Sequence, residues 1–234
     1  MKDKVIIVGH GASGKDHLSD YLIEKKFKKN ISYTTRPIRD NEVDEETYFF
    51  ISVEDFKEKI EIDFWHEYNV FVNDWYYGSS KEQFEKRNLF IKEPHGISLL
   101  SKEERERSYI VYVNIDESIR RGRLYERKDA DSVERRLEGD SKDFENFTDF
   151  DLVITNPNFS AETILFKIMS ETTIKAMSSI TSKEMLMHNV YLTYTENTNN
   201  FITFNTFFEK VTEDEEFSNM YKEMLENEKN VYLN

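Results

Sequence analysis

Residues 5–16 read Val-Ile-Ile-Val-Gly-His-Gly-Ala-Ser-Gly-Lys-Asp, and this stretch decides the fold. Four β-branched residues in a row are typical of a strand that is buried on both faces of a parallel sheet. The glycines then break the strand, and Leu18, Tyr21 and Leu22 recur at the spacing of an amphipathic helix. A strand, a glycine loop and a helix in this order predict an α/β fold, with a parallel sheet and flanking helices.

The loop itself fits the pattern G-x-x-x-x-G-K of the phosphate-binding loop, or P-loop, of nucleotide-binding proteins. Glycines let consecutive backbone N–H groups turn toward a phosphate, and the start of the helix adds positive potential. Lys15 would reach the β- and γ-phosphates of ATP. The residues predicted to bind ATP here are Gly9, Gly11, Ala12, Ser13, Gly14, Lys15 and Asp16.

Asp16 occupies the position where the pattern has Ser or Thr, whose hydroxyl binds Mg²⁺. A carboxylate is also a good ligand for Mg²⁺, but it equally suits the first turn of a helix because of the helix dipole. Both interpretations stay open. Mg²⁺ that accompanies ATP is the expected cofactor.

The composition restricts the class of protein. A chain of 234 residues with 38% hydrophobic residues suits one α/β domain, or one domain with a small appendage. The absence of cysteine excludes disulfides and thiolate metal sites. A formal net charge of −14 argues against binding of DNA or RNA polymers, whereas a few focused Arg and Lys can still hold a small phosphate ligand. No apolar run approaches the roughly 20 residues that span a bilayer, so we expect a cytoplasmic protein without membrane association.

Further elements follow along the chain. Core strands are predicted at 31–35, 89–91, 109–113 and 152–155. Residues 38–80 differ in kind, being polar and aromatic, and they predict a lobe inserted into the core. Its expected elements are strands at 48–51 and 69–72 and a helix at 53–60, with another helix at 81–87. An Arg-rich helical stretch is predicted at 117–139.

A second motif begins in the predicted strand at 31–35 and runs to Phe50. Arg36 and Arg39 suit a nucleotide phosphate because guanidinium groups bind phosphate oxygens bidentately, and Tyr48 can donate its hydroxyl to the same group. The stretch closely resembles the lobe of the guanylate kinase family, S-x-T-T-R-x-x-R-x-x-E-x-x-G-x-x-Y-x-F. Order and spacing are retained from Ser32 through Tyr48.

The resemblance implies the remaining acceptor contacts. Glu67 lies where the family has the acid that accepts hydrogen bonds from guanine N1 and N2. Tyr76-Tyr77-Gly78-Ser79 resembles the family's Y-Y-G-[ST], in which the second Tyr touches phosphate and the hydroxyl residue contacts guanine O6. Glu93 stands where the family has an aspartate, although Lys92, Pro94 and His95 around it depart from the pattern. The implied GMP-binding residues are Ser32, Arg36, Arg39, Tyr48, Glu67, Tyr77, Ser79 and Glu93.

The Arg-rich stretch resembles the family's lid, which closes over ATP. Arg127 and Arg136 match its arginines, whereas the Gly and Thr that usually follow are here Lys128 and Asp129. We expect the other arginines of the stretch to lie on a solvated helix face; these are Arg120, Arg121 and Arg123. Asn156 ends a V-I-x-N motif near which the family holds adenine.

The resemblance covers about residues 3–172. It implies a guanylate kinase-like domain at 1–172, with a GMP-binding lobe at 38–80 and a lid at 117–139. The implied reaction transfers the γ-phosphate of ATP to GMP or dGMP. The implied catalytic residues are Lys15, Arg36, Arg127 and Arg136, and the implied Mg²⁺ ligands are Asp16 and Glu93.

Two alternative functions stay open: a kinase for another nucleoside or deoxynucleoside monophosphate, and a non-catalytic guanylate kinase-like binding module. The extension at 173–234 is acidic and aromatic, and mixes strand-like segments with a helix predicted at 215–228. It is interpreted as a surface for oligomerisation or a partner, or as a cap over an apolar patch.

Overall fold

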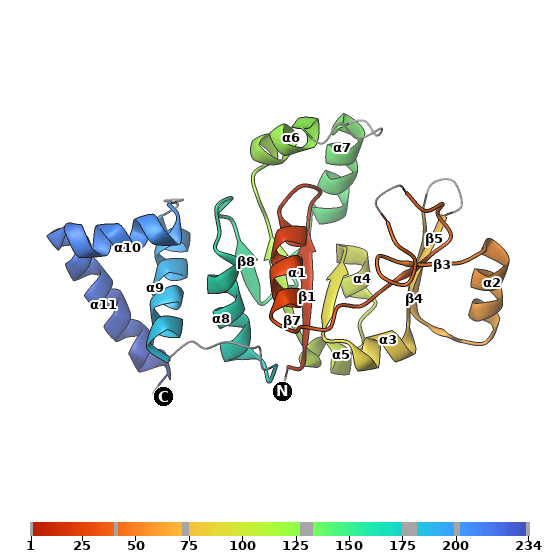
Figure 1. Cartoon of the computed structure of the whole chain (residues 1–234), viewed down its shortest axis with the longest axis horizontal. Coiled ribbons are helices and arrows are strands. Elements are labelled where there is room, and N and C mark those ends of the chain that lie inside the picture. Colours follow the sequence, from red (N-terminus) through yellow and green to blue (C-terminus); the bar gives the residue numbers. More distant parts are fainter. Residues whose placement is uncertain are drawn as a thin grey trace.

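A four-stranded parallel sheet lies at the centre of the molecule (Figure 1). The computed structural model describes residues 2–39, 42–71, 75–126, 133–174, 182–198 and 202–232, with side chains except at Phe71, 182–186 and 227–232. In spatial order the strands of the sheet are β6 (Leu89–Lys92), β1 (Lys4–Gly9), β7 (Ser108–Val113) and β8 (Leu152–Ile154). The strands predicted at 5–8, 89–91, 109–113 and 152–155 are thereby confirmed.

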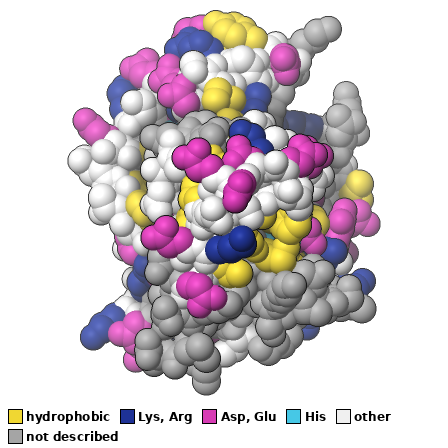
Figure 2. All heavy atoms as spheres, turned by 90° about the vertical axis from the view of Figure 1, so that its left-hand side faces the viewer, with side chains coloured by type: hydrophobic (Ala, Val, Ile, Leu, Met, Phe, Trp, Pro, Cys, Tyr) yellow, Lys and Arg dark blue, Asp and Glu magenta, His cyan; other side chains and the backbone are white. Residues whose placement is uncertain are grey.

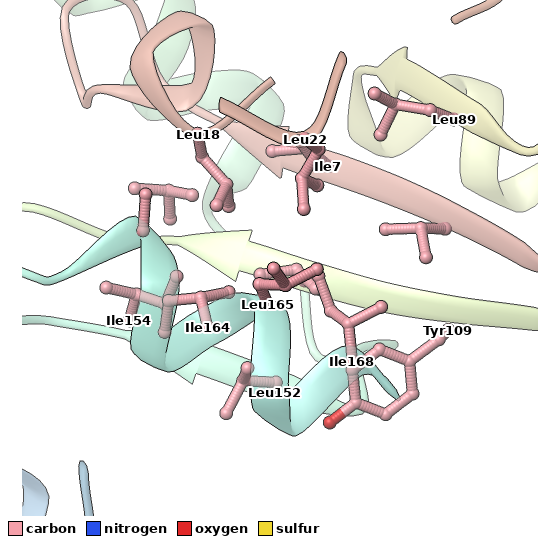
Figure 3. Packing of buried hydrophobic residues seen from close by; sticks show 14 of the residues in the cluster. Ile7, Leu18, Leu22, Leu89, Tyr109, Leu152, Ile154, Ile164, Leu165 and Ile168 are labelled. Atoms are coloured by element: carbon pink, nitrogen blue, oxygen red, sulfur yellow. The ribbon is translucent and has the colours of Figure 1, made fainter. Parts of the chain in front are cut away.

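Both faces of this sheet are covered, because successive side chains of a strand point to opposite sides. Val5 and Ile7 pack in one cluster with side chains of α1 (Lys15–Glu24) and α8 (Ala161–Glu171). Figure 3 shows Ile7 of this cluster with Leu18 and Leu22 of α1. Ile6 and Val8 pack on the opposite face. That face is covered by Phe84 of α3 (Lys81–Lys86), Ile97 of α4 (Pro94–Ser98) and Phe144 of α7 (Val133–Phe144). The prediction that the β-branched run at 5–8 forms a strand buried on both faces is thus confirmed.

A second, mixed sheet forms the lobe. Its strands, in spatial order, are β3 (Phe49–Phe50), β2 (Tyr33–Thr34), β5 (Trp75–Ser80) and β4 (Trp65–Phe71), and α2 (Val53–Glu61) lies beside it (Figure 1). The prediction of a core strand at 31–35 is wrong, because β2 pairs with β3 and β5 and belongs to the lobe. Just before β2, Lys29 forms an isolated bridge with Leu89 of the core sheet. The chain then enters the lobe, where the ring of Tyr33 stacks on that of Phe49 with centroids 4.5 Å apart.

The stretch predicted as a lid is helical in its described residues, in α6 (Glu117–Glu126) and in α7, which continues past residue 139 to Phe144. Residues 127–132 lie outside the described residues. The chain between β6 and β7 adds α4 and the short helix α5 (Lys102–Arg107).

Where the structure describes it, the extension forms three helices: α9 (Ser182–Thr198), α10 (Phe204–Glu213) and α11 (Glu215–Tyr232). The helix predicted at 215–228 is confirmed, but the expected strand-like segments are helical. Their aromatic residues have β propensity, yet packing of Tyr191, Tyr194 and Phe207 in one cluster overrides it. Leu192 of α9 joins the cluster under α8, so the extension continues the core. Figure 2 shows its outward face, where acidic side chains lie among exposed hydrophobic ones. Within the described residues, no helix combines the length and apolar character that crossing a membrane requires.

Candidate active site

The phosphate loop connects β1 to α1 at the carboxyl end of the parallel sheet. Gly9 admits no side chain, since a Cβ there would come within 2.8 Å of both Ser13 Oγ and the Val113 carbonyl oxygen. Gly14 has φ +104° and forms the N-cap of α1, a conformation that L residues with side chains rarely adopt. The loop therefore needs glycine at these two positions, and α1 begins at Lys15 with its N-terminus toward the loop.

Lys15 folds back over its own loop, where its Nζ donates to the His10 carbonyl oxygen at 3.1 Å. Asp16, next along the chain, is exposed in the first turn of α1. The Ser13 hydroxyl is buried and has no hydrogen-bond partner within the described residues. The loop thus holds both a cation and a buried polar group that could bind a phosphate.

His10 of the loop is buried against the aromatic end of α7. Its ring stacks on Phe144 with centroids 4.0 Å apart, and Tyr112 lies 5.9 Å away. Burial, followed by the positive charges of Arg120 and Lys15, lowers the pKa of His10 to about 4. The imidazole is therefore neutral at physiological pH, and adds no charge to the loop.

A carboxylate from the lid contacts the same loop. The Gly11 N–H donates to Asp140 Oδ2 at 2.7 Å, and Arg120 Nη1 lies 3.4 Å from that oxygen. Asp140 of α7 thus occupies one of the backbone donors that a phosphate would use. The sequence alone does not predict this residue, because the contact joins positions 129 residues apart and no local pattern marks it.

Two lid arginines shape the loop instead of facing solvent. Arg123 donates through Nη1 to the carbonyl oxygens of Ala12 (3.1 Å) and Ser13 (3.2 Å), and through Nη2 to that of Pro157 (3.0 Å). Arg120 is buried, and its Nε donates to the Ile115 carbonyl oxygen at 2.9 Å. The expectation of a solvated face is wrong for these two residues, because α6 packs across the loop.

The remaining lid arginines differ. Arg121 pairs with Glu117 at 2.8 Å on the partly exposed side of α6, as expected. Arg136 lies half-buried on α7. Arg127 lies outside the described residues.

Asn156 is buried at the end of β8 and joins the core to the extension. Its Oδ1 accepts from the Asn158 N–H at 2.8 Å, and its Nδ2 donates to the Tyr191 hydroxyl of α9 at 3.2 Å. That hydroxyl donates in turn to the Ile202 carbonyl oxygen at 2.8 Å. The Asn156 side chain is therefore committed to structure, which leaves any adenine contact there to the backbone.

Strand alternation divides the lobe sheet into two faces. Residues paired across neighbouring strands point to the same face; Glu67 is paired with Ser79, and Thr34 with Tyr77. On the opposite face, Gly78 lies against Trp65 and Phe56, and the rings of these two stack at 4.0 Å. One face therefore carries the predicted acceptor residues Glu67, Tyr77 and Ser79, and the other forms an aromatic core with α2.

Arg36 is held in place by three partners. Its Nη2 donates to Glu42 Oε1 at 2.6 Å, its Nε to the Tyr77 hydroxyl at 3.0 Å, and its Nη1 to the Pro37 carbonyl oxygen at 2.7 Å. Burial works against the guanidinium charge, but the hydrogen bonds with Glu42 and Tyr77 hold the pKa of Arg36 above its ordinary value. Glu42 was not among the predicted site residues, although the motif contains it at the right spacing.

The neighbours of Arg36 complete this part of the lobe. The Tyr48 ring lies 5.7 Å from the guanidinium carbon of Arg36 and 6.0 Å from the Tyr77 ring. Burial raises the pKa of Tyr48, so its hydroxyl stays protonated. Arg39, in contrast, is exposed at the edge of the described segment.

The end of β6 lies between the lobe and the phosphate loop. Lys92 forms a largely buried ion pair with Glu67. Glu93, the N-cap residue of α4, has a raised pKa, first through desolvation and then through the negative charges of Asp143 and Asp140, which Lys15 partly offsets. Consecutive residues of one strand end are thus coupled to the lobe and to the loop, respectively.

The fit to Mg²⁺ rests on this gathering of acids. Carboxylate oxygens are the ligands that Mg²⁺ prefers, and a cation would relieve the repulsion that raises the Glu93 pKa. Throughout the described ranges, no group of three His, Asp or Glu side chains is arranged to hold a metal by itself. That Asp16 and Glu93 bind the ion stays a prediction.

Comparison with known proteins shows which family the chain resembles. The family profile described as guanylate kinase matches residues 1–173. The guanylate kinase of Helicobacter pylori is 32% identical over 173 residues, which is 69% of this chain and 84% of that protein. That of Sulfurimonas denitrificans is 27% identical over 178 residues, or 71% and 86% of the two chains.

A solved structure supports the fold. The crystal structure of guanylate kinase from Anaplasma phagocytophilum superposes with a TM-score of 0.57 at 17% identity, covering 79% of this chain and 93% of that chain. The stretch after residue 173 lies outside the family match. With its parallel core, its mixed-sheet lobe and the family match over residues 1–173, the chain belongs to the guanylate kinase family.

Proposed function

We propose that the protein transfers the γ-phosphate of ATP to GMP or dGMP, giving ADP and GDP or dGDP. The observation that carries the proposal is the strand end at Lys92 and Glu93, where the acceptor lobe and the phosphate loop meet. A donor phosphate on the loop and an acceptor phosphate at Arg36 would approach each other across this strand end. The residues proposed for the donor half and for the acceptor half of the transfer site thus interact with neighbouring residues of one strand end.

The chemistry requires positioning and charge neutralisation. The acceptor is an ionised phosphate oxygen, so no general base is needed. Lys15, Arg36 and the lid residue Arg136 supply positive charge around the transferring group, as phosphoryl transfer requires. Asp16 and Glu93 would hold the Mg²⁺ that accompanies ATP, and the ion would supply positive charge against the charge that develops during transfer.

The two ends of the site have distinct roles in this proposal. The loop N–H groups and the start of α1 hold the phosphates of ATP. Arg36, fixed by Glu42, presents its fork to the acceptor phosphate, together with the Tyr48 and Tyr77 hydroxyls. Arg39 is exposed in this arrangement and would reach the acceptor on closure of the lobe.

The domain arrangement belongs to the same proposal. Residues 1–172 form the catalytic unit, with the acceptor lobe at 38–80 and the lid at 117–139. The extension at 173–234 serves as a structural cap, since Leu192 and Tyr191 connect α9 to the core and to Asn156.

A coupled assay of ADP release, run across all nucleoside and deoxynucleoside monophosphates, tests the function. We expect turnover with GMP and dGMP to exceed that with AMP, CMP and UMP. Equal turnover with every acceptor would overturn the guanine assignment. ATP binding without turnover of any acceptor, unaffected by Lys15→Ala, would favour the binding-module alternative.

A further inference from the structure

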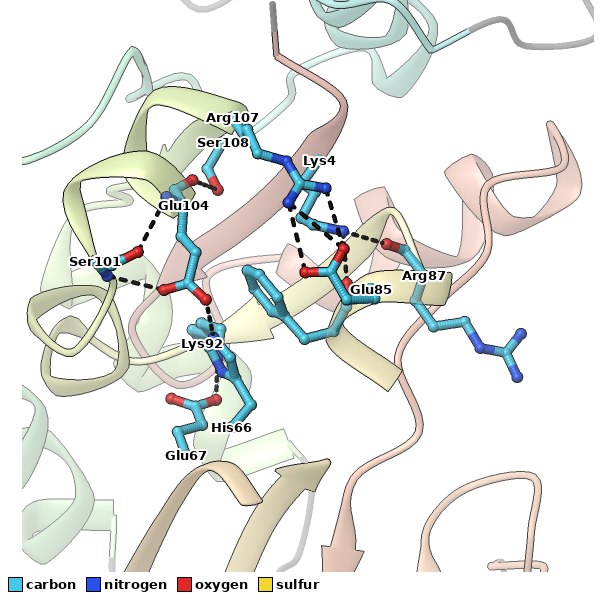
Figure 4. Close-up of polar contacts among 11 residues, drawn as sticks. Lys4, His66, Glu67, Glu85, Arg87, Lys92, Ser101, Glu104, Arg107 and Ser108 are labelled. Atoms are coloured by element: carbon cyan, nitrogen blue, oxygen red, sulfur yellow. Dashed lines mark hydrogen bonds and ion pairs between the residues drawn. The ribbon is translucent and has the colours of Figure 1, made fainter. Parts of the chain in front are cut away.

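The predicted base-reading carboxylate of Glu67 is already engaged by a lysine. Lys92 extends from β6 of the core to Glu67 Oε1 on β4, as Figure 4 shows. The Lys92 side chain is 3% exposed and that of Glu67 16% exposed, so solvent screens the pair weakly. On the other side of the carboxylate lies Gly96 of α4, where a Cβ would come within 3.0 Å of Glu67 Oε2. The carboxylate is thus fixed between an ammonium group and a helix backbone.

Hydroxyl groups lie on the adjoining strands. Asn30 Nδ2 donates to Ser32 Oγ and to Ser79 Oγ, each at 3.0 Å. Because each hydroxyl accepts this N–H, its own hydrogen remains to be donated, apart from a long 3.5 Å contact between the two. Ser79 is the residue paired with Glu67 across β5 and β4. Hydrogen donors therefore stand beside a hydrogen acceptor on one face of the lobe.

This pattern matches one kind of base edge. A 6-oxopurine presents a carbonyl oxygen next to a ring N–H, which complements a hydroxyl donor beside a carboxylate. Adenine presents an amino group next to an unprotonated ring nitrogen, so it would set donor against donor and acceptor against acceptor. The lobe face thus selects 6-oxopurines over adenine.

Guanine carries a further donor, its 2-amino group, and here Lys92 matters. A free carboxylate can accept the ring N–H and the 2-amino group with its two oxygens. With Oε1 engaged by Lys92, Oε2, which lies beside Gly96, is the oxygen left to accept from the base. Resting on the proposed function, we propose that Lys92 is a positioning residue that makes the acceptor site recognise the 6-oxopurine edge with little regard to the 2-amino group, so that IMP is an acceptor nearly as good as GMP.

Steady-state kinetics with GMP, IMP and AMP test this role in the full-length protein. In the wild type we expect kcat/KM for GMP to exceed that for IMP by less than about tenfold, whereas mismatched polar groups should reject AMP by a factor of ~10⁴. Lys92→Met keeps the length of the side chain and releases Glu67. It should raise the ratio of GMP to IMP by about tenfold, the scale of one hydrogen bond to a charged group. The change should fall on KM and leave kcat nearly constant, because base contacts act equally on ground and transition states.

The matched control is Lys81→Met. It removes a solvent-exposed lysine–carboxylate pair, which Lys81 of α3 forms with Asp63. It should leave the GMP to IMP ratio unchanged. A wild-type ratio above about tenfold overturns the role of Lys92 even if Lys92→Met does not fold, and so does a ratio that Lys92→Met leaves unchanged. A protein that phosphorylates neither GMP nor IMP fails the proposed function itself, whereas turnover of GMP alone fails only this inference.

Discussion

The phosphate loop and the acceptor lobe would contact their predicted ligands by different means. The loop offers backbone N–H groups, set by the chain geometry at Gly9 and Gly14 between a buried strand and a helix. The lobe offers side chains on one face of a small mixed sheet, each held by another side chain, as Glu42 holds Arg36. A single substitution can therefore change which acceptor the lobe selects, whereas the loop, apart from Lys15, should tolerate changes that do not alter its backbone.

The largest expected effect removes the one loop side chain that would reach the transferring phosphate. Lys15→Ala should lower kcat by about 10³-fold, the upper scale for loss of one transition-state donor. Stability should change by less than about 0.5 kcal/mol, because Lys15 Nζ bonds only a carbonyl oxygen of its own loop in the described structure. The exposed Lys28→Ala is the control in the ADP-release assay. A Lys15→Ala enzyme with wild-type kcat would contradict the proposed mechanism.

The second prediction concerns the phosphate loop alone, where His10 should make the free energy of unfolding depend on pH. His10 has a pKa of about 4 when folded, against an ordinary value of 6.5. The unfolded chain therefore binds more protons between these values, so the free energy of unfolding falls as pH drops from 6.5 to 4, by about 3 kcal/mol from this group alone. Above pH 6.5 the contribution of His10 is constant.

Urea unfolding of the wild type and of His10→Gln across this range measures the effect. The difference between their slopes isolates His10 from the carboxylates that titrate in the same window. His17→Gln, at an exposed position of α1, keeps the number of histidines equal and should follow the wild type. Parallel curves for wild type and His10→Gln would refute the buried neutral imidazole.

The third prediction concerns the lobe alone. Arg36→Lys keeps the charge but loses the fork that binds Glu42, Tyr77 and a phosphate together. We expect kcat/KM for GMP to fall by about 30- to 100-fold, since hydrogen bonds to charged groups are worth roughly 1.5–3 kcal/mol. The Kd for ATP, measured by calorimetry, should stay constant. Arg39→Lys, at an exposed residue, should cost less, and equal losses for both variants would contradict the role given to Arg36.

The same contrast separates what the sequence predicts from what it does not. The β1 strand, its loop and α1 follow from local pattern, because burial and glycine geometry act over a dozen residues. The lobe contains β2, a strand of two residues whose place depends on pairing with β5. Because this pairing joins distant segments, the sequence alone wrongly predicted the strand in the core sheet. The sequence does not predict the α9 and α10 helices, because their aromatic residues favour strands by intrinsic propensity. These segments are helical because the aromatic residues pack together in one cluster.

Within the candidate site, the residues that can be predicted from the sequence are those that belong to short motifs of the family. The structure brings Ser32, Glu67 and Ser79 to one face, while their contacts with GMP remain predictions. The contacts that escaped prediction join distant segments: Arg123 with the loop carbonyls, and Asp140 with Gly11. No local spacing encodes such pairs, because they form only when α6 and α7 pack over the loop.

The smallest expected effect concerns the contact between the backbone of the phosphate loop and the side chain of Asp140. Asp140 places a negative charge at the Gly11 N–H, where an ATP phosphate would also bind. Asp140→Asn keeps an oxygen acceptor at that donor and removes the charge, so the Kd for ATP should fall by about tenfold at low salt, with a smaller gain at high salt because screening weakens the repulsion. Asp143→Asn, at an exposed position of the same helix, should have a weaker effect. If Asp140→Asn leaves ATP binding unchanged while Asp143→Asn strengthens it, the contact with Gly11 does not compete with nucleotide, and general repulsion from the acidic lid is the better explanation.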